Sequence, residues 1–337
     1  MITRYAGLLI VLILTLNSQN LLGQDRGLEG LVERLKNGSK VGKQWLVLIA
    51  VNRYQEWPNL QYPAVDAESI RDILTSRYYI DKVIELYNEE AKKADIIKLF
   101  ANLQKKLKPD DSLLVYYAGH GHLDKISNSG FWIPSDAGLD DFAQNNWLPN
   151  SQIRGLIRNL KTKHFLLISD ACFSGDLLDV SRAKPPAIDS EYFKKAYGRV
   201  SRQVLTSGAS EAVPDRSEFT FQLKQELEMN TEPYIDPMML YSSIRLGVKE
   251  TIPLMGNLQG TGHQEGASFL LFLKPEDKDS SVAETPAVAK AAPSVVEKIY
   301  GSLKVKVKQG GAVFFGWCSS ARYCRIQRAM DRRVGTG

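Results

Sequence analysis

The sequence contains few cysteines, which limits the kinds of protein that it can be. Three cysteines in 337 residues exclude a small disulfide-framework fold. No CxxC or HxxxH pair accompanies them, so we expect no zinc or other metal site. Cys318 and Cys324 could pair with each other, which would leave Cys172 as the odd thiol. The presence of a free thiol in an oxidising compartment requires an explanation, and a reactive role for the thiol is one.

Long apolar runs are also scarce. The stretch from Ala6 to Leu16 follows Arg4 and has the length of a signal-peptide core. It is too short to cross a membrane comfortably, which takes about 20 residues. We therefore interpret residues 1–23 as a signal peptide and expect export to the periplasm or out of the cell, with no stable membrane span. An uncleaved anchor and a buried helix are the alternatives.

A broad basic surface is missing from the main part of the chain. The formal net charge is +5, but the Lys and Arg residues after Gly301 more than account for it, because Asp331 is the only acid among them. The rest of the chain is therefore slightly acidic. Nucleic-acid binding needs a basic patch or stripe, so we expect no nucleic-acid partner.

The apolar segments predict an α/β fold. Residues 44–54, 111–118 and 163–171 form nearly continuous apolar runs, which is typical of strands covered on both faces. Helical spacing of apolar residues separates them at 64–78 and 93–107. Strands that alternate with helices predict a mostly parallel sheet with helices on both faces. We expect further strands at "QVLTSGA" and, as the last of the sheet, "GASFLLFL".

Composition divides the chain around this region. We expect a lead-in at 24–43, one domain at 44–275, a linker at 276–299 rich in Ala, Pro and Ser, and a basic tail at 300–337. The start of the tail weakly resembles small PEGA-type surface modules, and we assign the tail no function. Residues 176–203 are polar and basic, which favours a long exposed loop.

Two apolar runs each end beside a reactive side chain. His120 follows the run that ends at Ala118, and Cys172 follows the run that ends at Ala171. The carboxyl ends of parallel strands meet at one edge of a sheet, where reacting groups gather. A thiol is a weak nucleophile until an imidazole removes its proton. The pair therefore indicates nucleophilic catalysis.

Other interpretations of these residues remain open. A lone buried cysteine is usually inert, and a lone histidine is usually structural. His122 is a second candidate base on spacing alone, whereas His164 and His263 fit structural or exposed positions. Backbone N–H groups of Gly121 and Cys172 are candidates to stabilise an oxyanion.

The segments "LLVYYAGHG" and "LLISDACFSG" resemble the catalytic core of caspase-like cysteine peptidases, and most of all the metacaspase-type and bacterial members. The resemblance runs from about Gln44 to Leu273, and the interval from His120 to Cys172 agrees with the roughly 50 residues typical of such enzymes. It implies that Cys172 is the nucleophile, that His120 is the general base and acid, and that Gly121 contributes to the oxyanion hole. This chemistry requires no cofactor.

The same resemblance assigns two acids to the primary specificity pocket. Asp66 in "YPAVDA" and Asp170 match acidic residues that line this pocket in metacaspase-type enzymes. Two carboxylates in a recess favour a cationic side chain and reject Asp. A helix cap at Asp66 and a turn at Asp170 are the structural alternatives. Ala118 departs from the family pattern, because many members carry Ser there.

The resemblance therefore implies an exported cysteine endopeptidase that cleaves peptides or proteins after Arg or Lys. A non-catalytic caspase-like module that binds peptides is the alternative. A thiol redox protein is a third interpretation, which lacks a resolving cysteine beside Cys172. Self-cleavage within 176–203 is a further hypothesis, with an ordinary solvated loop as its rival. It rests on a set of basic residues: Arg182, Lys184, Lys194, Lys195, Arg199 and Arg202.

Overall fold

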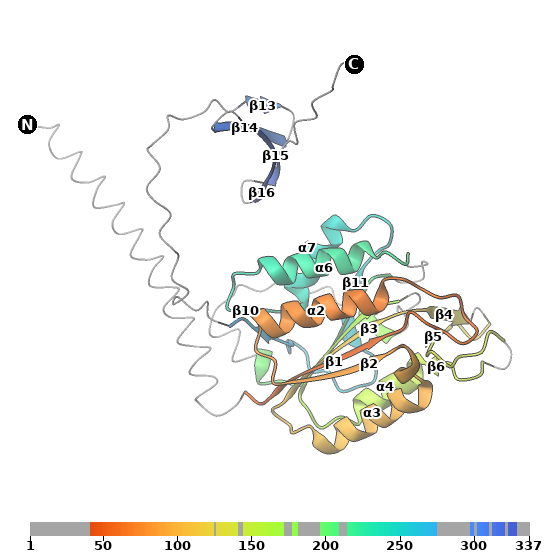
Figure 1. Ribbon diagram of the computed structural model, residues 1–337. Helices are drawn as coiled ribbons and strands as arrows, with labels where there is room; N and C mark the ends of the chain where they lie inside the picture. The colour runs from red at the N-terminus through yellow and green to blue at the C-terminus, as the bar shows by residue number, and fades with distance from the viewer. Residues whose placement is uncertain are drawn as a thin grey trace, which may run out of the picture. The chain divides into compact units, whose positions relative to one another are not determined.

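A computed structural model (Figure 1) describes most of residues 41–274 and parts of the tail. The described ranges are 41–124, 126–140, 144–171, 177–180, 196–208, 214–274, 297–299, 302–309, 312–320 and 323–328. The chain divides into two compact units, Met1–Glu276 and Asp277–Gly337, and each is described by itself. Among the described residues, no helix is long and apolar enough to cross a membrane.

A seven-stranded sheet forms the centre of the first unit, in the order β2-β1-β3-β7-β9-β11-β8. Strands β2, β1, β3, β7 and β9 run parallel, whereas β11 is antiparallel to both β9 and β8. The expectation of a mostly parallel sheet is confirmed. The strands are β1 (Gln44–Ala50), β2 (Lys82–Tyr87), β3 (Ser112–Ala118), β7 (His164–Asp170), β8 (Leu178–Val180), β9 (Ser201–Thr206) and β11 (Leu254–Leu258).

Helices cover both faces of this sheet (Figure 1). One face packs on α2 (Pro63–Arg77), α6 (Glu218–Met229) and α7 (Pro237–Gly247), and the other on α3 (Lys93–Lys106) and α4 (Asn150–Arg158), with a short 3₁₀ helix η1 (Asn88–Glu90) before α3. Strand β3 shows why its sequence is apolar throughout. Leu114 and Tyr116 point to the first face, and Val115 and Tyr117 to the second, so every side chain is buried.

The last strand of the sheet is not the one expected from the sequence. In chain order, the last strand of the sheet is β11, which lies between β9 and the edge strand β8. Its segment "LMGNL" was missed because it is short and contains Gly and Asn. The segment "GASFLLFL" contains only β12 (Leu271–Phe272), which pairs with β10 (Tyr234–Ile235) in a separate two-stranded sheet. An apolar run predicts burial but does not identify the partner strand.

The expectation of an exposed loop over the whole of 176–203 is also wrong. Residues 178–180 form β8, Tyr197 is buried, and β9 begins at Ser201. Arg202 is only 4% exposed, because its guanidinium donates hydrogen bonds to the carbonyl groups of Leu160, Thr162, Lys163 and Ser201. Residues 181–195, with most of the basic residues proposed for self-cleavage, lie outside the described residues.

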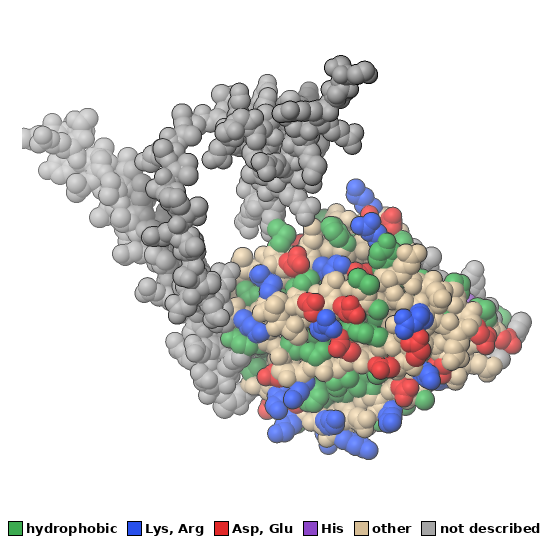
Figure 2. Space-filling model, in the orientation of Figure 1, with side chains coloured by type: hydrophobic (Ala, Val, Ile, Leu, Met, Phe, Trp, Pro, Cys, Tyr) green, Lys and Arg blue, Asp and Glu red, His purple; other side chains and the backbone are tan. Residues whose placement is uncertain are grey.

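A three-stranded antiparallel sheet follows β3 directly. It consists of β4 (Gly121–Asp124), β5 (Ser129–Trp132) and β6 (Leu148–Pro149), in that order. The Trp132 ring stacks on the Tyr117 ring with centroids 3.9 Å apart, which joins this sheet to the end of β3. On the face drawn in Figure 2, the described Lys and Arg side chains are interspersed with Asp and Glu.

The second unit contains a four-stranded antiparallel sheet. Its strands are β13 (Glu297–Ile299), β14 (Ser302–Gln309), β15 (Ala312–Ser320) and β16 (Tyr323–Arg328). The basic tail, to which the sequence analysis assigned no function, thus contains strands. Cys318 of β15 lies opposite Cys324 of β16 in the register of this pair.

His164, at the start of β7, makes the stability of the fold sensitive to acid. It is 1% exposed and its ring stacks on Tyr197. Burial lowers its pKa to about 3, assisted by the charges of Lys163 and Arg202. In the unfolded chain this imidazole binds a proton near pH 6.5, so protonation favours unfolding as the pH falls from about 6.5 towards 3.

We expect His164→Phe to weaken this acid sensitivity, because phenylalanine keeps the stacked ring and cannot titrate. Urea unfolding at pH 7 and pH 4.5 measures the effect. Between these values the wild type should lose about 2 kcal/mol more free energy of unfolding than the variant does. Equal losses in the two proteins would contradict a neutral, buried His164.

Candidate active site

The carboxyl edge of the sheet has a switch point between β1 and β3. The chain leaves β1 towards β2 on one side, and β3 lies on the other side of β1. Loops that leave such a point diverge and open a crevice between them, which is where open α/β sheets bind ligands. The segments that follow β1, β3 and β7 therefore meet at one place, and they carry most of the residues described below.

His120 is held in this crevice by hydrogen bonds of its backbone and of its ring. Its backbone N–H donates to the Tyr54 hydroxyl at 2.7 Å, and its carbonyl accepts from the Tyr117 hydroxyl at 2.8 Å. The ring Nε2 lies 2.8 Å from the Pro58 carbonyl oxygen. Because a carbonyl oxygen can only accept, Nε2 carries the hydrogen, and in the neutral ring Nδ1 is then the proton acceptor.

The glycine before His120 is required by a close approach. A Cβ atom added at Gly119 would lie 2.6 Å from the Tyr54 hydroxyl oxygen, and its φ of +155° is also unfavourable for other residues. That hydroxyl accepts the His120 N–H, so any side chain at Gly119 would disturb the histidine. Gly121 is buried at the start of β4, opposite Trp132.

The surroundings of His120 favour its neutral form. Its ring lies against Tyr54 and Trp57, with centroids 4.8 and 5.5 Å away. Burial lowers the pKa of His120 below its usual range, and the Pro58 hydrogen bond and the charge of Asp215 partly oppose this. At neutral pH the imidazole is therefore mostly in the form that can accept a proton.

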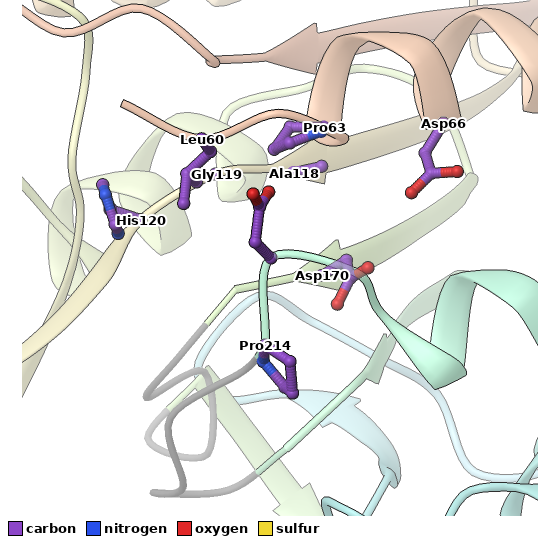
Figure 3. A pocket seen from close by; sticks show the side chains of 9 residues that line it. Leu60, Pro63, Asp66, Ala118, Gly119, His120, Asp170 and Pro214 are labelled. Atoms are coloured by element: carbon purple, nitrogen blue, oxygen red, sulfur yellow. The ribbon is translucent and has the colours of Figure 1, made fainter. Parts of the chain in front are cut away.

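A pocket opens beside His120 (Figure 3). Its volume is about 370 Å³ when the open mouth is included. Three carboxylates reach it from different parts of the fold: Asp66 from α2, Asp170 from the end of β7, and Asp215 from the segment before α6. The other lining residues are Leu60, Pro63, Ala118, Gly119, His120 and Pro214. Ala118, where a Ser was expected from the family pattern, forms part of the wall.

Asp170 is the most deeply buried of the three acids, at 7% exposure. Its Oδ2 accepts the Thr220 hydroxyl hydrogen, and Thr220 in turn lies 2.9 Å from the Tyr116 hydroxyl. Oδ1 is buried and has no geometric hydrogen-bond partner within the part of the chain that the structure describes. Burial raises the pKa of Asp170, and the hydroxyl groups of Thr220, Ser217 and Ser207 partly oppose this rise. A buried carboxylate in the wall of a pocket favours a cation or a hydrogen-bond donor there.

Asp66 has a partner that the sequence did not reveal. Its Oδ1 lies 2.7 Å from Nζ of Lys224 on α6, and the two side chains are 14% and 24% exposed. Lys224 stands four residues after Thr220, so one face of α6 presents both side chains to the acids. The resemblance implied two carboxylates that attract a cation, and the structure shows that one of them is already paired with Lys224.

The remaining candidates lie either outside the described residues or away from the pocket. Cys172 lies outside the described residues, which end at Ala171 on that side. His122 packs against Trp57 and Trp147 rather than in the pocket. Two histidines lie elsewhere: His164 at the opposite, amino end of β7, and His263, whose Nδ1 accepts the Arg202 N–H.

Sequence reasoning missed Tyr54, Pro58 and Asp215. Pro58 acts through its backbone, and the other two act through contacts with residues far along the chain. Only the position of Tyr54 and Pro58 after a buried strand was a signal for them. Among the described residues, no three His, Cys, Asp or Glu side chains are grouped as metal ligands.

Comparison with known proteins gives one family. The model of the caspase domain matches residues 43–273, more than half of the chain. No curated protein matches the sequence. A protein of Geobacter sulfurreducens of known structure matches with 17% identity and a TM-score of 0.49, over 68% of this chain and 100% of its own. Caspase-1 from Spodoptera frugiperda matches with 14% identity and a TM-score of 0.43, over 67% and 92%. Neither solved structure is close enough to inform the chemistry of the site.

The close approach at Gly119 gives a test that does not depend on activity. We expect Gly119→Ala to lower the free energy of unfolding by about 1–3 kcal/mol, because its methyl group would meet the Tyr54 hydroxyl. In a Tyr54→Phe background the cost should be smaller, since the opposing oxygen is gone. Urea unfolding of the four proteins in this cycle measures the coupling.

Gly155→Ala is the matched control. An added Cβ at this position in α4 meets nothing within 4 Å, so the substitution should be neutral or stabilising. A cost of Gly119→Ala that is equal in the wild-type and the Tyr54→Phe backgrounds would contradict the proposed contact.

Proposed function

Because this chain belongs to the caspase-domain family of cysteine peptidases, we propose that it is an endopeptidase that cleaves after Arg or Lys through Cys172 and His120. Membership of this family implies peptide or protein substrates. One observation carries the proposal. His120 is fixed by the Pro58 carbonyl, in the tautomer of a general base, at the wall of an acidic pocket.

In the acylation step, Nδ1 of His120 takes the proton of the Cys172 thiol. The thiolate then attacks the carbonyl carbon of the substrate, and the carbonyl oxygen becomes an oxyanion. Backbone N–H groups of Gly121 and Cys172 stabilise this charge. The imidazolium gives its proton to the leaving amine, so the peptide bond breaks and an acyl-enzyme remains.

In the second step, water replaces the amine. His120 removes a proton from the water as it attacks the thioester, and the acid product leaves with Cys172 restored. The Nε2–H group stays bonded to Pro58 throughout, so the ring keeps its orientation while Nδ1 accepts and releases protons. No cofactor takes part in these steps.

Specificity for a basic residue follows from Asp170. A guanidinium or ammonium group that enters the pocket is attracted by the Asp170 carboxylate in its wall. An acidic substrate side chain would face the carboxylates and be rejected. Asp66 contributes less than Asp170, because Lys224 already balances its charge.

Two further parts of the proposal concern export and self-cleavage. We infer export from the apolar leader at Ala6–Leu16. Of the basic residues proposed for self-cleavage, Arg202 is excluded because it is buried in strand β9.

Peptide hydrolysis tests the function directly. We expect fluorogenic peptides that end in Arg or Lys to be cleaved, peptides that end in Asp to be resistant, and Cys172→Ala to be inactive on all of them. Activity that survives the substitution would refute the assigned nucleophile, and a preference for Asp would refute the pocket. A wild type that binds basic peptides without cleaving them would support the non-catalytic module.

The two pocket acids should differ in their contributions. Asp170→Asn removes the charge that the substrate meets, so kcat/KM for an Arg peptide should fall roughly tenfold to a hundredfold, mainly through KM. Asp66→Asn combined with Lys224→Met removes a pair that is already balanced, and the loss should be smaller. Thermal unfolding of both variants controls for damage to the fold. An equal or larger loss of kcat/KM in the double variant would show that the substrate cation binds Asp66 in place of Lys224.

A further inference from the structure

We propose that Asp215 is a positioning residue, whose carboxylate fixes the segment that orients His120 and so links the specificity pocket to the base. This inference rests on the proposed function and adds a residue to it. Asp215 lines the same pocket as His120 and Asp170. It also holds a segment of backbone more than 150 residues away along the chain.

The contacts of Asp215 are with backbone groups. Both of its carboxylate oxygens lie 2.9 Å from the Gln61 nitrogen, and Oδ1 also lies 3.2 Å from the Tyr62 nitrogen. Gln61 follows Pro58 by three residues, and Pro58 holds the His120 ring. A shift of this segment would therefore move the acceptor of the Nε2–H bond.

The segment from Asn52 to Tyr62 is braced internally, so that anchoring one end restrains the other. The Leu60 N–H donates to the Asn52 carbonyl at 2.8 Å, and the Asn52 side chain donates to the Gln61 carbonyl at 2.8 Å. Asn59 accepts the backbone N–H of Tyr54 at 3.0 Å. Tyr54 and Pro58, the two contacts of His120 in this segment, are thus tied to the Asp215 anchor.

Two side chains hold the N-terminus of helix α2. Its N-cap residue Tyr62 makes no side-chain cap hydrogen bond, but the Asn52 side-chain oxygen accepts the Ala64 N–H at 2.7 Å, and Asp215 accepts the Tyr62 N–H from another part of the fold. A purely structural cap would affect stability alone. Asp215 differs from such a cap because it also lines the pocket and its charge raises the pKa of His120.

The charge of Asp215 favours the protonated form of His120 and opposes the effect of burial on its pKa. Asp66 and Asp170 are the other acids of the pocket, and Tyr54 contacts the ring. Removal of the Asp215 charge should therefore lower the pKa of His120. The pKa of His120 is thus a readout that a helix cap alone would not change.

The first experiment measures His120 directly. The full chain with Cys172→Ala is titrated by NMR, and the His120 signal is assigned by loss in His120→Gln among only four histidines. We expect Asp215→Asn to move the His120 midpoint to lower pH. Asparagine keeps one acceptor oxygen for the backbone, so this variant should fold.

Asp136→Asn is the matched control. Asp136 accepts the backbone N–H of Lys93 at 2.9 Å, at the start of α3, and does not line the pocket. This variant should lose thermal stability in the same way as Asp215→Asn while the His120 midpoint stays at its wild-type value. A His120 midpoint that is unchanged in Asp215→Asn, or equally shifted in Asp136→Asn, would overturn the proposal.

The second experiment uses hydrolysis of an Arg peptide. We expect Asp215→Asn to move the acidic limb of the pH profile to lower pH and to retain more of the kcat than Asp215→Ala does. Asp215→Ala loses the anchor as well, so kcat should fall about tenfold or more. A kcat equal to that of the wild type in a folded Asp215→Ala variant would overturn the positioning role. An inactive wild type whose His120 midpoint still responds to Asp215→Asn would reject the proposed function alone.

Discussion

The hydrogen bond from His120 Nε2 to the Pro58 carbonyl is the contact on which the candidate site depends. It fixes which ring nitrogen is free, and it does so without a charged partner. A carboxylate in the place of Pro58 would also fix the tautomer, but its charge would stabilise the imidazolium. With a neutral acceptor and a partly buried ring, the imidazole stays unprotonated at neutral pH and remains able to act as a base.

The acids of the pocket are stabilised by partners of different kinds. Lys224 balances Asp66, backbone N–H groups bind Asp215, and Thr220 donates to one oxygen of Asp170. The second oxygen of Asp170 is buried without a geometric partner in the described chain. Burial of such an oxygen costs free energy in the empty pocket, and a cation bound nearby would offset part of it.

Short-range patterns predicted the parts of the fold that depend on local burial. The continuous apolar runs identified β1, β3 and β7, because these strands are covered on both faces. The same logic failed for Arg202, whose basic side chain suggested an exposed loop. Its buried guanidinium donates to four carbonyl groups, and three of these are brought to it only by the folding of the chain. Periodicity also could not show that β11, rather than "GASFLLFL", completes the sheet.

The site was predictable to the extent that its residues lie at strand ends or in family motifs. His120, Asp66 and Asp170 were found in this way, and the structure brings all three to one pocket. Lys224 and Asp215 were missed because each acts across more than 150 residues, and a single sequence carries no record of such pairs.

The segment before α2 is where stability and chemistry are coupled. It begins at the end of β1, carries the anchors of His120, and ends at a helix N-terminus that needs an acceptor. The Tyr62 N–H is accepted by Asp215 in the pocket wall, and the Ala64 N–H is accepted by the Asn52 side chain of the same segment. Asp215 thus belongs both to the wall of the pocket and to the hydrogen bonds that hold the segment carrying Pro58.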